Sequence, residues 1–253
     1  MIFLKSPEEV QAIRRANLIV AEVHEALKEA VEPGVTTADL NAMAEECARR
    51  RGATPAFKGY SVGQKVFPAA LCSSVNNEVV HGIPSARRVL KEGDIVSLDF
   101  GVLYQGYYGD AAVTVPVGEV TEPTRRLLEV TEEALYAAIQ EARVGNRIGD
   151  VAAMIQTTAE RAGFSVVREF VGHGVGRYLH EEPQVPNFGI RSSGIPLQEG
   201  MVLAIEPMVN AGGPDVYVTD DGWTAVTADG SLSAHFEHSI AITKNGPYIL
   251  SQL

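Results

Sequence analysis

The chain contains an internal repeat that places acidic residues at matched positions in two distant segments. Lys91 to Val102, KEGDIVSLDFGV, aligns without a gap on Gln198 to Val209, QEGMVLAIEPMV. In this register Asp99 falls on Glu206, and each carboxylate interrupts an otherwise apolar run. A repeat of this kind predicts a fold built from two related halves, each of which supplies acids to one shared centre.

Two weaker echoes extend the repeat. YYGDAAVTV at 107–115 resembles HFEHSIAIT at 235–243 less closely, and there we take Asp110 as the counterpart of Glu237. GVTTADL at 34–40 also resembles GNRIGDV at 145–151. We therefore expect one domain over residues 1–253, composed of halves at about 1–118 and 119–253.

Four acids that converge inside a protein need compensating charge, because burial of an unpaired carboxylate is costly. The apolar runs that contain these acids have no Lys or Arg to supply it. Two divalent cations would neutralise the four carboxylates, so the sequence predicts a dinuclear metal site. A donor set rich in carboxylates and poor in histidine favours manganese, iron or cobalt over a closed structural zinc site.

The pattern of apolar and capping residues predicts an α+β fold with mostly antiparallel strands. Helices are expected from Ser6 to the break at Pro33, from Thr37 to Gly52, and over 124–143 and 148–161. A hairpin is expected at 94–115, around a turn near Tyr104 and Gln105, with further strands near Val166 and over 202–209 and 239–242. Asp99 and Asp110 are equidistant from that turn, which places them opposite or nearly opposite each other. The two halves should share one sheet, with helices on its outer face and the site in the concave face.

Histidines complete the predicted site. The glycine-rich segment GHGVGRYLHEEPQVPN at 172–187 supplies His173 as a nitrogen ligand and His180 as a hydrogen-bond donor to substrate. We expect His24 to face solvent, and His235 and His238 to be structural or to lie behind the ligands.

A serine nucleophile is rejected. GYSVG at 59–63 fits the G-x-S-x-G pattern, but a segment typical of strand and loop follows Ser61, where a nucleophile elbow needs a helix.

Composition excludes several classes of protein. The formal charge of −11 over 253 residues argues against a nucleic-acid surface. Neither a long apolar stretch nor a signal peptide is present, so we expect no membrane contact. Two cysteines, Cys47 and Cys72, suit a reducing cytoplasm. The sequence lacks a heptad pattern, which leaves a monomer as the expectation.

The order Asp, Asp, His, Glu, Glu, together with NNEVVHGIP at 76–84, SLDFGVLYQGYYGD at 97–110 and AIEPMV at 204–209, resembles the type I methionine aminopeptidases of the M24 metallopeptidases. The resemblance covers essentially the whole chain. It implies the pita-bread fold, in which two pseudo-symmetric halves surround two divalent metal ions, here cobalt, manganese, iron or zinc.

The resemblance also implies roles for single residues. Asp110 and Glu237 would bridge the metals, Asp99 would complete one metal site, and His173 with Glu206 would complete the other. His81 and His180 match substrate-contacting histidines, and Cys72 and Trp223 match positions that line the slot for the methionine side chain. Glu206 is the expected general base, because a terminal ligand has a free oxygen that could reach the attacking water. The chain departs from the family pattern at 59–68, where Tyr60 and Phe67 would serve, and at Leu179, where an aromatic residue is common.

The implied reaction is removal of the initiator methionine from nascent polypeptides whose second residue is small. The expected partners are nascent N-termini, with transient ribosome association, and we expect the short form without a ribosome-docking extension. Two alternatives stay open. A Xaa-Pro dipeptidase or aminopeptidase P shares the fold but usually has a substantial N-terminal domain. A non-catalytic binding module on this fold should have lost ligands.

Overall fold

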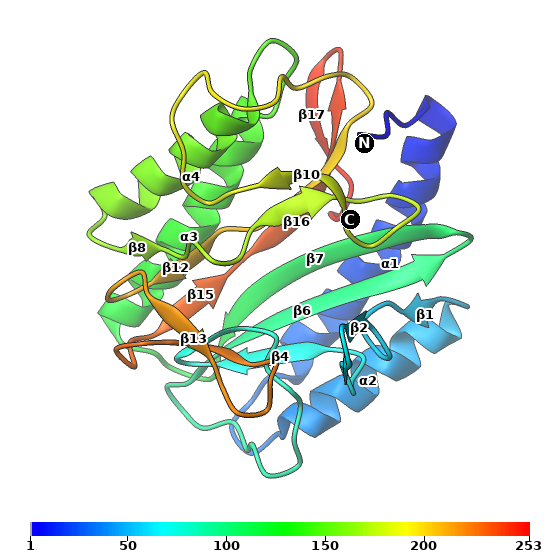
Figure 1. The fold of residues 1–253 in the computed structure, drawn as a ribbon. Coiled ribbons are helices and arrows are strands. Elements are labelled where there is room, and N and C mark those ends of the chain that lie inside the picture. The colour runs from blue at the N-terminus through cyan, green and yellow to red at the C-terminus, as the bar shows by residue number, and fades with distance from the viewer. Residues whose placement is uncertain (1) are drawn as a thin grey trace.

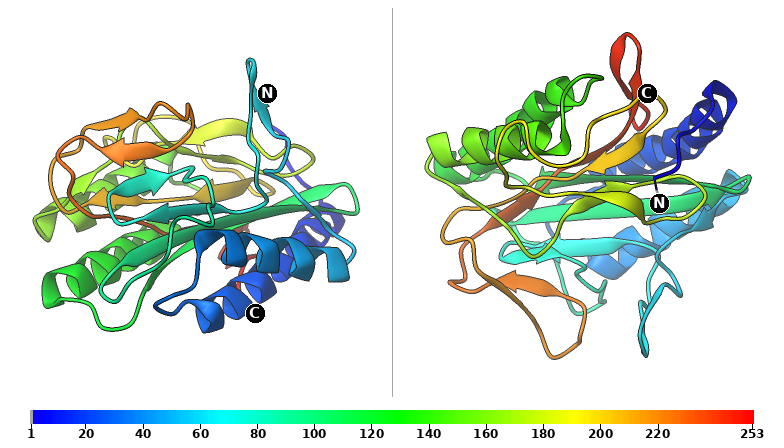
Figure 2. Two further views of the ribbon diagram at one scale, coloured as in Figure 1. Left: turned by 90° about the horizontal axis from the view of Figure 1, so that it is seen from below. Right: turned by 45° about the horizontal axis from the view of Figure 1, so that its top comes forward.

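The computed structural model describes residues 2–253, which form four α-helices packed against one face of a large antiparallel sheet (Figure 1). Figure 2 shows the helices gathered on one side of that sheet, with short strands and loops on the other side. The helices are α1 (Pro7–Ala30), α2 (Thr37–Arg50), α3 (Glu122–Glu141) and α4 (Ile148–Arg161). This arrangement confirms the predicted α+β class.

Capping side chains fix where these helices begin. Ser6 accepts a hydrogen bond from the backbone N–H of Glu9, and the Glu9 carboxylate accepts one from the backbone N–H of Ser6. Asp39 accepts from the Thr36 N–H at 3.0 Å, and Asp150 accepts from the Arg147 N–H at 2.8 Å. The echo between residues 34–40 and 145–151 therefore corresponds to one shared contact, from the N-cap N–H to an Asp carboxylate, and only α2 adds a side-chain cap, from Thr36.

The main sheet has nine strands, in the order β1-β6-β7-β16-β11-β9-β10, with β4 added to β6 and β17 added to β16. The smaller sheets are β15-β12-β8, β13-β14-β5 and the hairpin β2-β3. The bounds are β1 Thr54–Pro55, β2 Ser61–Val62, β3 Lys65–Val66, β4 Cys72–Val75, β5 Glu78–Val80, β6 Ile95–Tyr104, β7 Tyr107–Pro116, β8 Ser165–Val166, β9 Gly172–Gly174, β10 Glu181–Val185, β11 Val202–Ile205, β12 Met208–Asn210, β13 Val216–Val218, β14 Ala225–Thr227, β15 Ser233–His235, β16 Glu237–Thr243 and β17 Gly246–Ile249.

The predicted hairpin exists, but its register differs from the prediction. The turn is Gln105-Gly106, one residue later than expected, so Asp99 pairs with Ala112 and Gly101 pairs with Asp110. The two acids are diagonal neighbours on the same face of the sheet. The prediction that they are equally distant from the turn was wrong. The weaker echo is also shifted, because an ungapped count brings Asp110 onto His238 and not onto Glu237.

The strand expected over residues 202–209 is broken in two. β11 ends at Ile205, and β12 begins at Met208 and pairs with β8 and β15 in a different sheet. Pro207 has no N–H to donate to a sheet ladder, which explains the break. Glu206 therefore lies between two strands, whereas the sequence analysis had placed it inside one.

The two largest apolar clusters divide largely along the sequence, whereas a smaller cluster joins Ile13 to residues of the second half. One contains residues from Ala16 to Val117, centred on side chains such as Leu40 and Phe100. The other contains residues from Leu127 to Ile242 and draws only Ile95 from earlier in the chain. Direct pairing between the strands that join these regions, β7 and β16, is limited to two residue pairs, Glu237↔Ala112 and His238↔Ala111. A boundary near residue 118 remains a prediction of the sequence repeat.

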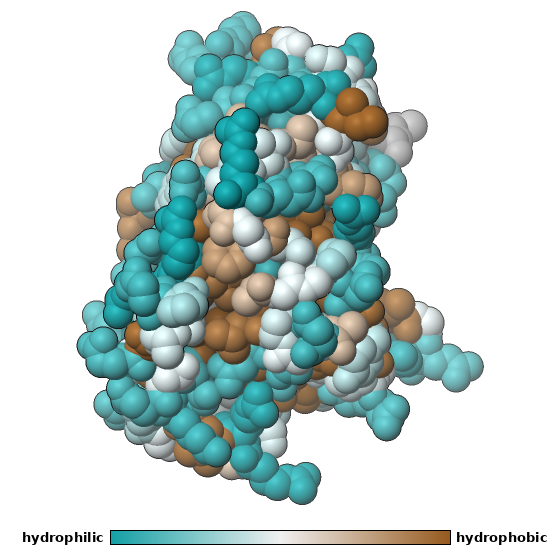
Figure 3. Space-filling model, turned by 90° about the vertical axis from the view of Figure 1, so that its left-hand side faces the viewer, coloured by the Kyte–Doolittle hydropathy of each residue, from teal (hydrophilic) through white to brown (hydrophobic). Residues whose placement is uncertain are grey.

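His24 does not face solvent as expected. Its side chain is on α1 and is buried, with 6% of the residue exposed. The helix lies directly over β6 and β7, so its inner face has little access to water. The face drawn in Figure 3 is mainly hydrophilic, with a group of hydrophobic side chains in its middle. None of the helices between residues 2 and 253 is long and apolar enough to cross a membrane.

Candidate metal centre

A cavity of about 530 Å³ lies against the sheet and collects every residue that the sequence analysis assigned to the site. Its walls include the five predicted metal ligands and the four predicted substrate contacts, namely Asp99, Asp110, His173, Glu206, Glu237, Cys72, His81, His180 and Trp223. Their ligand or substrate roles remain predictions. Their convergence from β4 through β16 into one cavity is a property of the fold.

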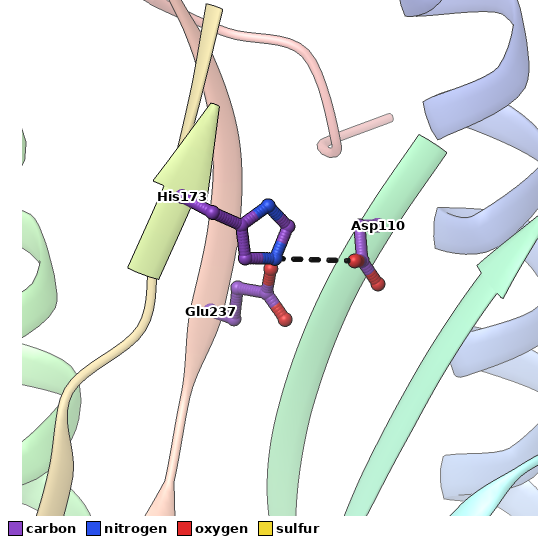
Figure 4. A group of neighbouring side chains, drawn as sticks. All are labelled: Asp110, His173 and Glu237. Atoms are coloured by element: carbon purple, nitrogen blue, oxygen red, sulfur yellow. Dashed lines mark ion pairs between the residues drawn. The ribbon is translucent and has the colours of Figure 1, made fainter. Parts of the chain in front are cut away.

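Three of these side chains point toward one another at the base of the cavity (Figure 4). Asp110 on β7, His173 on β9 and Glu237 on β16 each offer a donor atom, and the three atoms lie within 4.8 Å of one another. His173 Nε2 is 3.8 Å from Asp110 Oδ2 and 3.7 Å from Glu206 Oε1. Such spacing suits a cation between the donors, and it makes this group a candidate metal-binding cluster.

The backbone orients His173 for this purpose. Its Nδ1 donates to the carbonyl oxygen of Gly174 at 2.9 Å, which leaves the Nε2 lone pair directed at the acids. The glycines on either side are required by packing. A Cβ on Gly172 would lie 2.4 Å from the Ala204 oxygen, and one on Gly174 would lie 2.5 Å from the Glu182 oxygen. Residues 172 and 174 therefore have no room for a side chain, so the histidine between them is flanked by glycines.

Sheet register places the carboxylates in adjacent rows. Asp99 on β6 and Glu237 on β16 both pair with Ala112 on β7, so one small side chain separates the two acids. Asp110 is in the next row, opposite Gly101. A Cβ on Gly101 would lie 3.1 Å from Asp110 Oδ1 and 2.9 Å from a ring carbon of Phe57. The row is therefore open only because residue 101 has no side chain.

Within residues 2–253, no lysine or arginine forms an ion pair with these acids, whose only such partners are histidines. Asp99 Oδ1, Asp110 Oδ1 and Glu237 Oε1 are buried and have no hydrogen-bond partner within residues 2–253. Burial raises the pKa of Asp99 to about 7 and that of Glu206 to about 8, and it raises the pKa of Asp110 and Glu237 well above the usual range. Unsatisfied carboxylate oxygens beside a correctly oriented imidazole fit bound cations.

An apolar slot opens beside the acids. Cys72 on β4 pairs directly with Asp99, and burial raises the pKa of its thiol, which keeps it neutral. Phe67 and Trp223 form an edge-to-face contact with ring centroids 5.3 Å apart. Cys72, Phe67 and Trp223 therefore present neutral, mainly apolar surface to whatever enters the slot.

The two predicted substrate histidines lie at the edge of this slot. Burial lowers the pKa of His81 to about 4 and also lowers that of His180, so both rings are neutral at physiological pH. The Tyr60 hydroxyl lies 2.7 Å from His180 Nδ1. His81 has a φ of 61°, a left-handed conformation that is uncommon outside glycine.

Sequence reasoning missed two aromatic side chains and one contact of His235. Phe57 and Phe170 line the cavity, and no periodic pattern distinguishes them from ordinary core residues. His235 lies 3.6 Å from Glu206 through Nε2 and Oε2. The sequence gave a weak signal for this residue, since His235 precedes the strand that begins at Glu237. A position behind the ligands had been expected for it.

Comparisons with known proteins agree with this geometry. Metallopeptidase family M24 matches the chain over residues 11–244. The chain belongs to metallopeptidase family M24. Among curated M24 relatives, methionine aminopeptidase 1 of Bacillus subtilis is 51% identical over 253 residues and covers both chains completely. Methionine aminopeptidase of Clostridium perfringens is 52% identical over 251 residues, which is 99% of each chain.

Solved M24 structures confirm the pita-bread fold. The methionine aminopeptidase of Thermotoga maritima matches with a TM-score of 0.97 and 49% identity, over 100% of both chains. The prolidase of Pyrococcus horikoshii matches with a TM-score of 0.78 and 27% identity, over 98% of this chain but 63% of that one. The M24 fold alone therefore does not separate the two activities, whereas identity and coverage favour the first.

Proposed function

We propose that this M24 metallopeptidase is a methionine aminopeptidase that removes N-terminal methionine when the second residue is small. The observation that carries the proposal is the apolar slot of Cys72, Phe67 and Trp223 directly beside the carboxylate cluster. A slot without charge suits an unbranched thioether side chain, and the acids place the reacting bond next to it. Relatives about half identical over the full length bear this name.

The proposed cofactor is a pair of divalent cations, with manganese, cobalt, iron or zinc as candidates. Asp99, Asp110, His173, Glu206 and Glu237 would hold them, since these residues supply the unpartnered donors. When bound, the cations supply charge neutralisation of the acids, activation of a water molecule and polarisation of the scissile carbonyl.

Glu206 is the proposed general base. Its carboxylate lies between two imidazoles, with Oε1 facing His173 and Oε2 facing His235. A carboxylate held in this way can take a proton from the attacking water and return it to the leaving amine.

His180 and His81 would contact the substrate on the other side of the scissile bond. If the Tyr60 hydroxyl donates to His180 Nδ1, the proton of the neutral ring is on Nε2, where it can donate to the developing oxyanion. His81 is neutral and lies 6.4 Å from Trp223 between ring centroids, so it can contact the scissile amide near the slot.

A peptide-cleavage assay tests the proposal. The protein is stripped of metal, supplied with Mn²⁺, Co²⁺ or Fe²⁺, and given three peptides. We expect metal-dependent release of methionine from Met-Ala-Ser, while Ala-Ala-Ser stays intact. Cleavage confined to bonds before proline in a Met-Pro peptide would move the chain to the Xaa-Pro group. No cleavage with any of the metals would favour a binding module.

The setting of the reaction is part of the proposal. Nascent polypeptide N-termini are the proposed substrates, with transient ribosome association, and the protein is proposed to act as a cytoplasmic monomer. Two unpaired cysteines, Cys47 and Cys72, support a reducing compartment. Size-exclusion chromatography with light scattering tests the monomer, and co-sedimentation with ribosomes tests the association.

A further inference from the structure

His235 is buried behind the proposed metal centre. It ends β15, and only 1% of the residue is exposed. Its ring is not among the walls of the cavity, so a substrate in the cavity does not meet it. Its Nε2 faces Glu206 Oε2 at 3.6 Å, on the side of the carboxylate away from His173.

The ring has no other polar partner. Both nitrogens of His235 are buried without a hydrogen bond to any of residues 2–253. Buried imidazole nitrogens left unpaired are unfavourable, and native structures usually satisfy them. Besides Glu206, the titratable groups that act on the ring electrostatically are Asp99 and His81. Glu206 Oε2, at 3.6 Å, is a carboxylate oxygen that faces this unpaired ring.

The backbone of His235, at the end of β15, is hydrogen-bonded to β7 of the main sheet. Its N–H donates to Thr114 Oγ1 at 2.9 Å, and the Thr114 hydroxyl donates to the His235 carbonyl at 2.7 Å. Ser97 Oγ lies 2.8 Å from the same hydroxyl. His235 also pairs with Met208, two residues after Glu206. The ring is thus presented to Glu206 from a rigid support.

We propose that His235 is a positioning residue that donates its Nε2–H to the outer oxygen of Glu206. The hydrogen bond fixes the rotation of the carboxylate, so that Oε1 stays directed toward His173 and the cations. The two atoms lie 3.6 Å apart, so a movement of about 0.5 Å brings them to hydrogen-bond distance. Outer groups of this kind orient metal ligands and set their affinity. The inference rests on the proposed function for the role of Glu206.

Two substitutions separate a hydrogen-bonding role from a packing role. His235→Leu fills the site but removes the donor, whereas His235→Gln keeps an N–H. We expect His235→Leu to weaken Mn²⁺ binding to metal-stripped protein by roughly 10–100-fold in calorimetry and to lower kcat more than it changes KM. His235→Gln should restore most of the affinity. His24→Leu is the matched control, since His24 is also buried but lies on α1, and it should leave Mn²⁺ affinity unchanged.

The outcomes are decisive in both directions. Wild-type Mn²⁺ affinity in His235→Leu would overturn the inference, and so would an equal loss in His235→Gln and His235→Leu. Should His235→Leu fail to fold by circular dichroism, His235→Met takes its place as the variant without a donor. A wild-type chain that bound Mn²⁺ but released no methionine would overturn the proposed function and leave this inference standing.

Discussion

At the scale of single residues, burial acts on the acids and the histidines of this chain in opposite ways. It lowers the pKa of all six histidines, so the imidazoles in the cavity remain neutral and able to bind metal. It raises the pKa of the acids in the metal cluster. Without cations, the folded state therefore holds protons that the unfolded chain would release.

This difference gives the metal-free protein an unusual dependence on pH. A carboxyl with a raised folded-state pKa stabilises the fold while protonated, and the contribution is lost as the pH rises through that pKa. Below about pH 7 the histidines oppose this trend, because the unfolded chain takes up their protons. Above that pH the histidines are neutral in both states, and Glu206, with a folded-state pKa of about 8, is the acid that goes on losing its proton.

We expect the free energy of unfolding in EDTA to fall between about pH 7 and 8, by up to about 1.4 kcal/mol per pH unit, because Glu206 is still protonated in the folded state and ionised in the unfolded chain. Urea titrations at several pH values measure it. Saturating Mn²⁺ should abolish the fall, since the cations replace the protons. A stability that rises over this range in EDTA would contradict the assignment of the raised pKa values to these acids.

His81→Ala separates substrate contact from metal binding. The ring lines the cavity but is not part of the donor cluster, so we expect kcat on Met-Ala-Ser to fall by roughly 100-fold or more with metal content unchanged. Asp99→Asn is the comparison, and it should lose metal at one of the two sites. Elemental analysis of both variants decides the matter. Loss of metal from His81→Ala would show that the division between ligands and substrate contacts is wrong.

At the scale of elements, the register of β6 against β7 decides how close the acids come. The hairpin and its strands could be predicted from alternating apolar residues, but the register could not, because a one-residue shift of the turn moves every cross-strand pair by two. Pro207 was visible in the sequence, yet the apolar run across it suggested one strand. His24 was misjudged because a helix with polar neighbours was assumed to be exposed at that position.

Gly101→Ala tests the register directly. The added Cβ would lie 3.1 Å from Asp110 Oδ1 and 3.2 Å from the Gly109 carbonyl oxygen, so the carboxylate must move. We expect weaker Mn²⁺ binding, by about tenfold or more, although every predicted donor remains. Gly213→Ala is the matched control, because its Cβ would meet nothing nearer than 3.7 Å. Equal Mn²⁺ affinity in calorimetry for both variants would show that the row tolerates a methyl group.

At the scale of the whole molecule, the donors for the cations come from both sides of the β7–β16 pairing. The resemblance and the repeat sufficed to predict the fold. They also named nine residues that the fold brings to one cavity, and the ligand and substrate roles of these residues stay predictions. They did not predict that Phe57 and Phe170 line the cavity, nor that His235 faces Glu206, because these contacts depend on packing between segments far apart in sequence.

Metal binding should therefore stabilise the entire fold. Mn²⁺ at 100 times its Kd should add about 2.7 kcal/mol to the free energy of unfolding, which is a rise of about 5–10 °C in Tm for a chain of this size. Differential scanning fluorimetry with and without Mn²⁺ measures it. Asp110→Asn should show little of this rise, and an equal rise in that variant would mean that Mn²⁺ acts elsewhere.

The two apolar clusters have a consequence for how the chain could be divided. One lies almost wholly before Val117 and the other after Leu127, and the exposed Gly118 and Glu119 lie between them. A polypeptide cut there would yield two fragments, each with its own buried apolar side chains and each with only part of the donor set. Added cations would then bind donors of both fragments and hold the split enzyme together. Recovery of activity from the mixed fragments would report the presence of the metal.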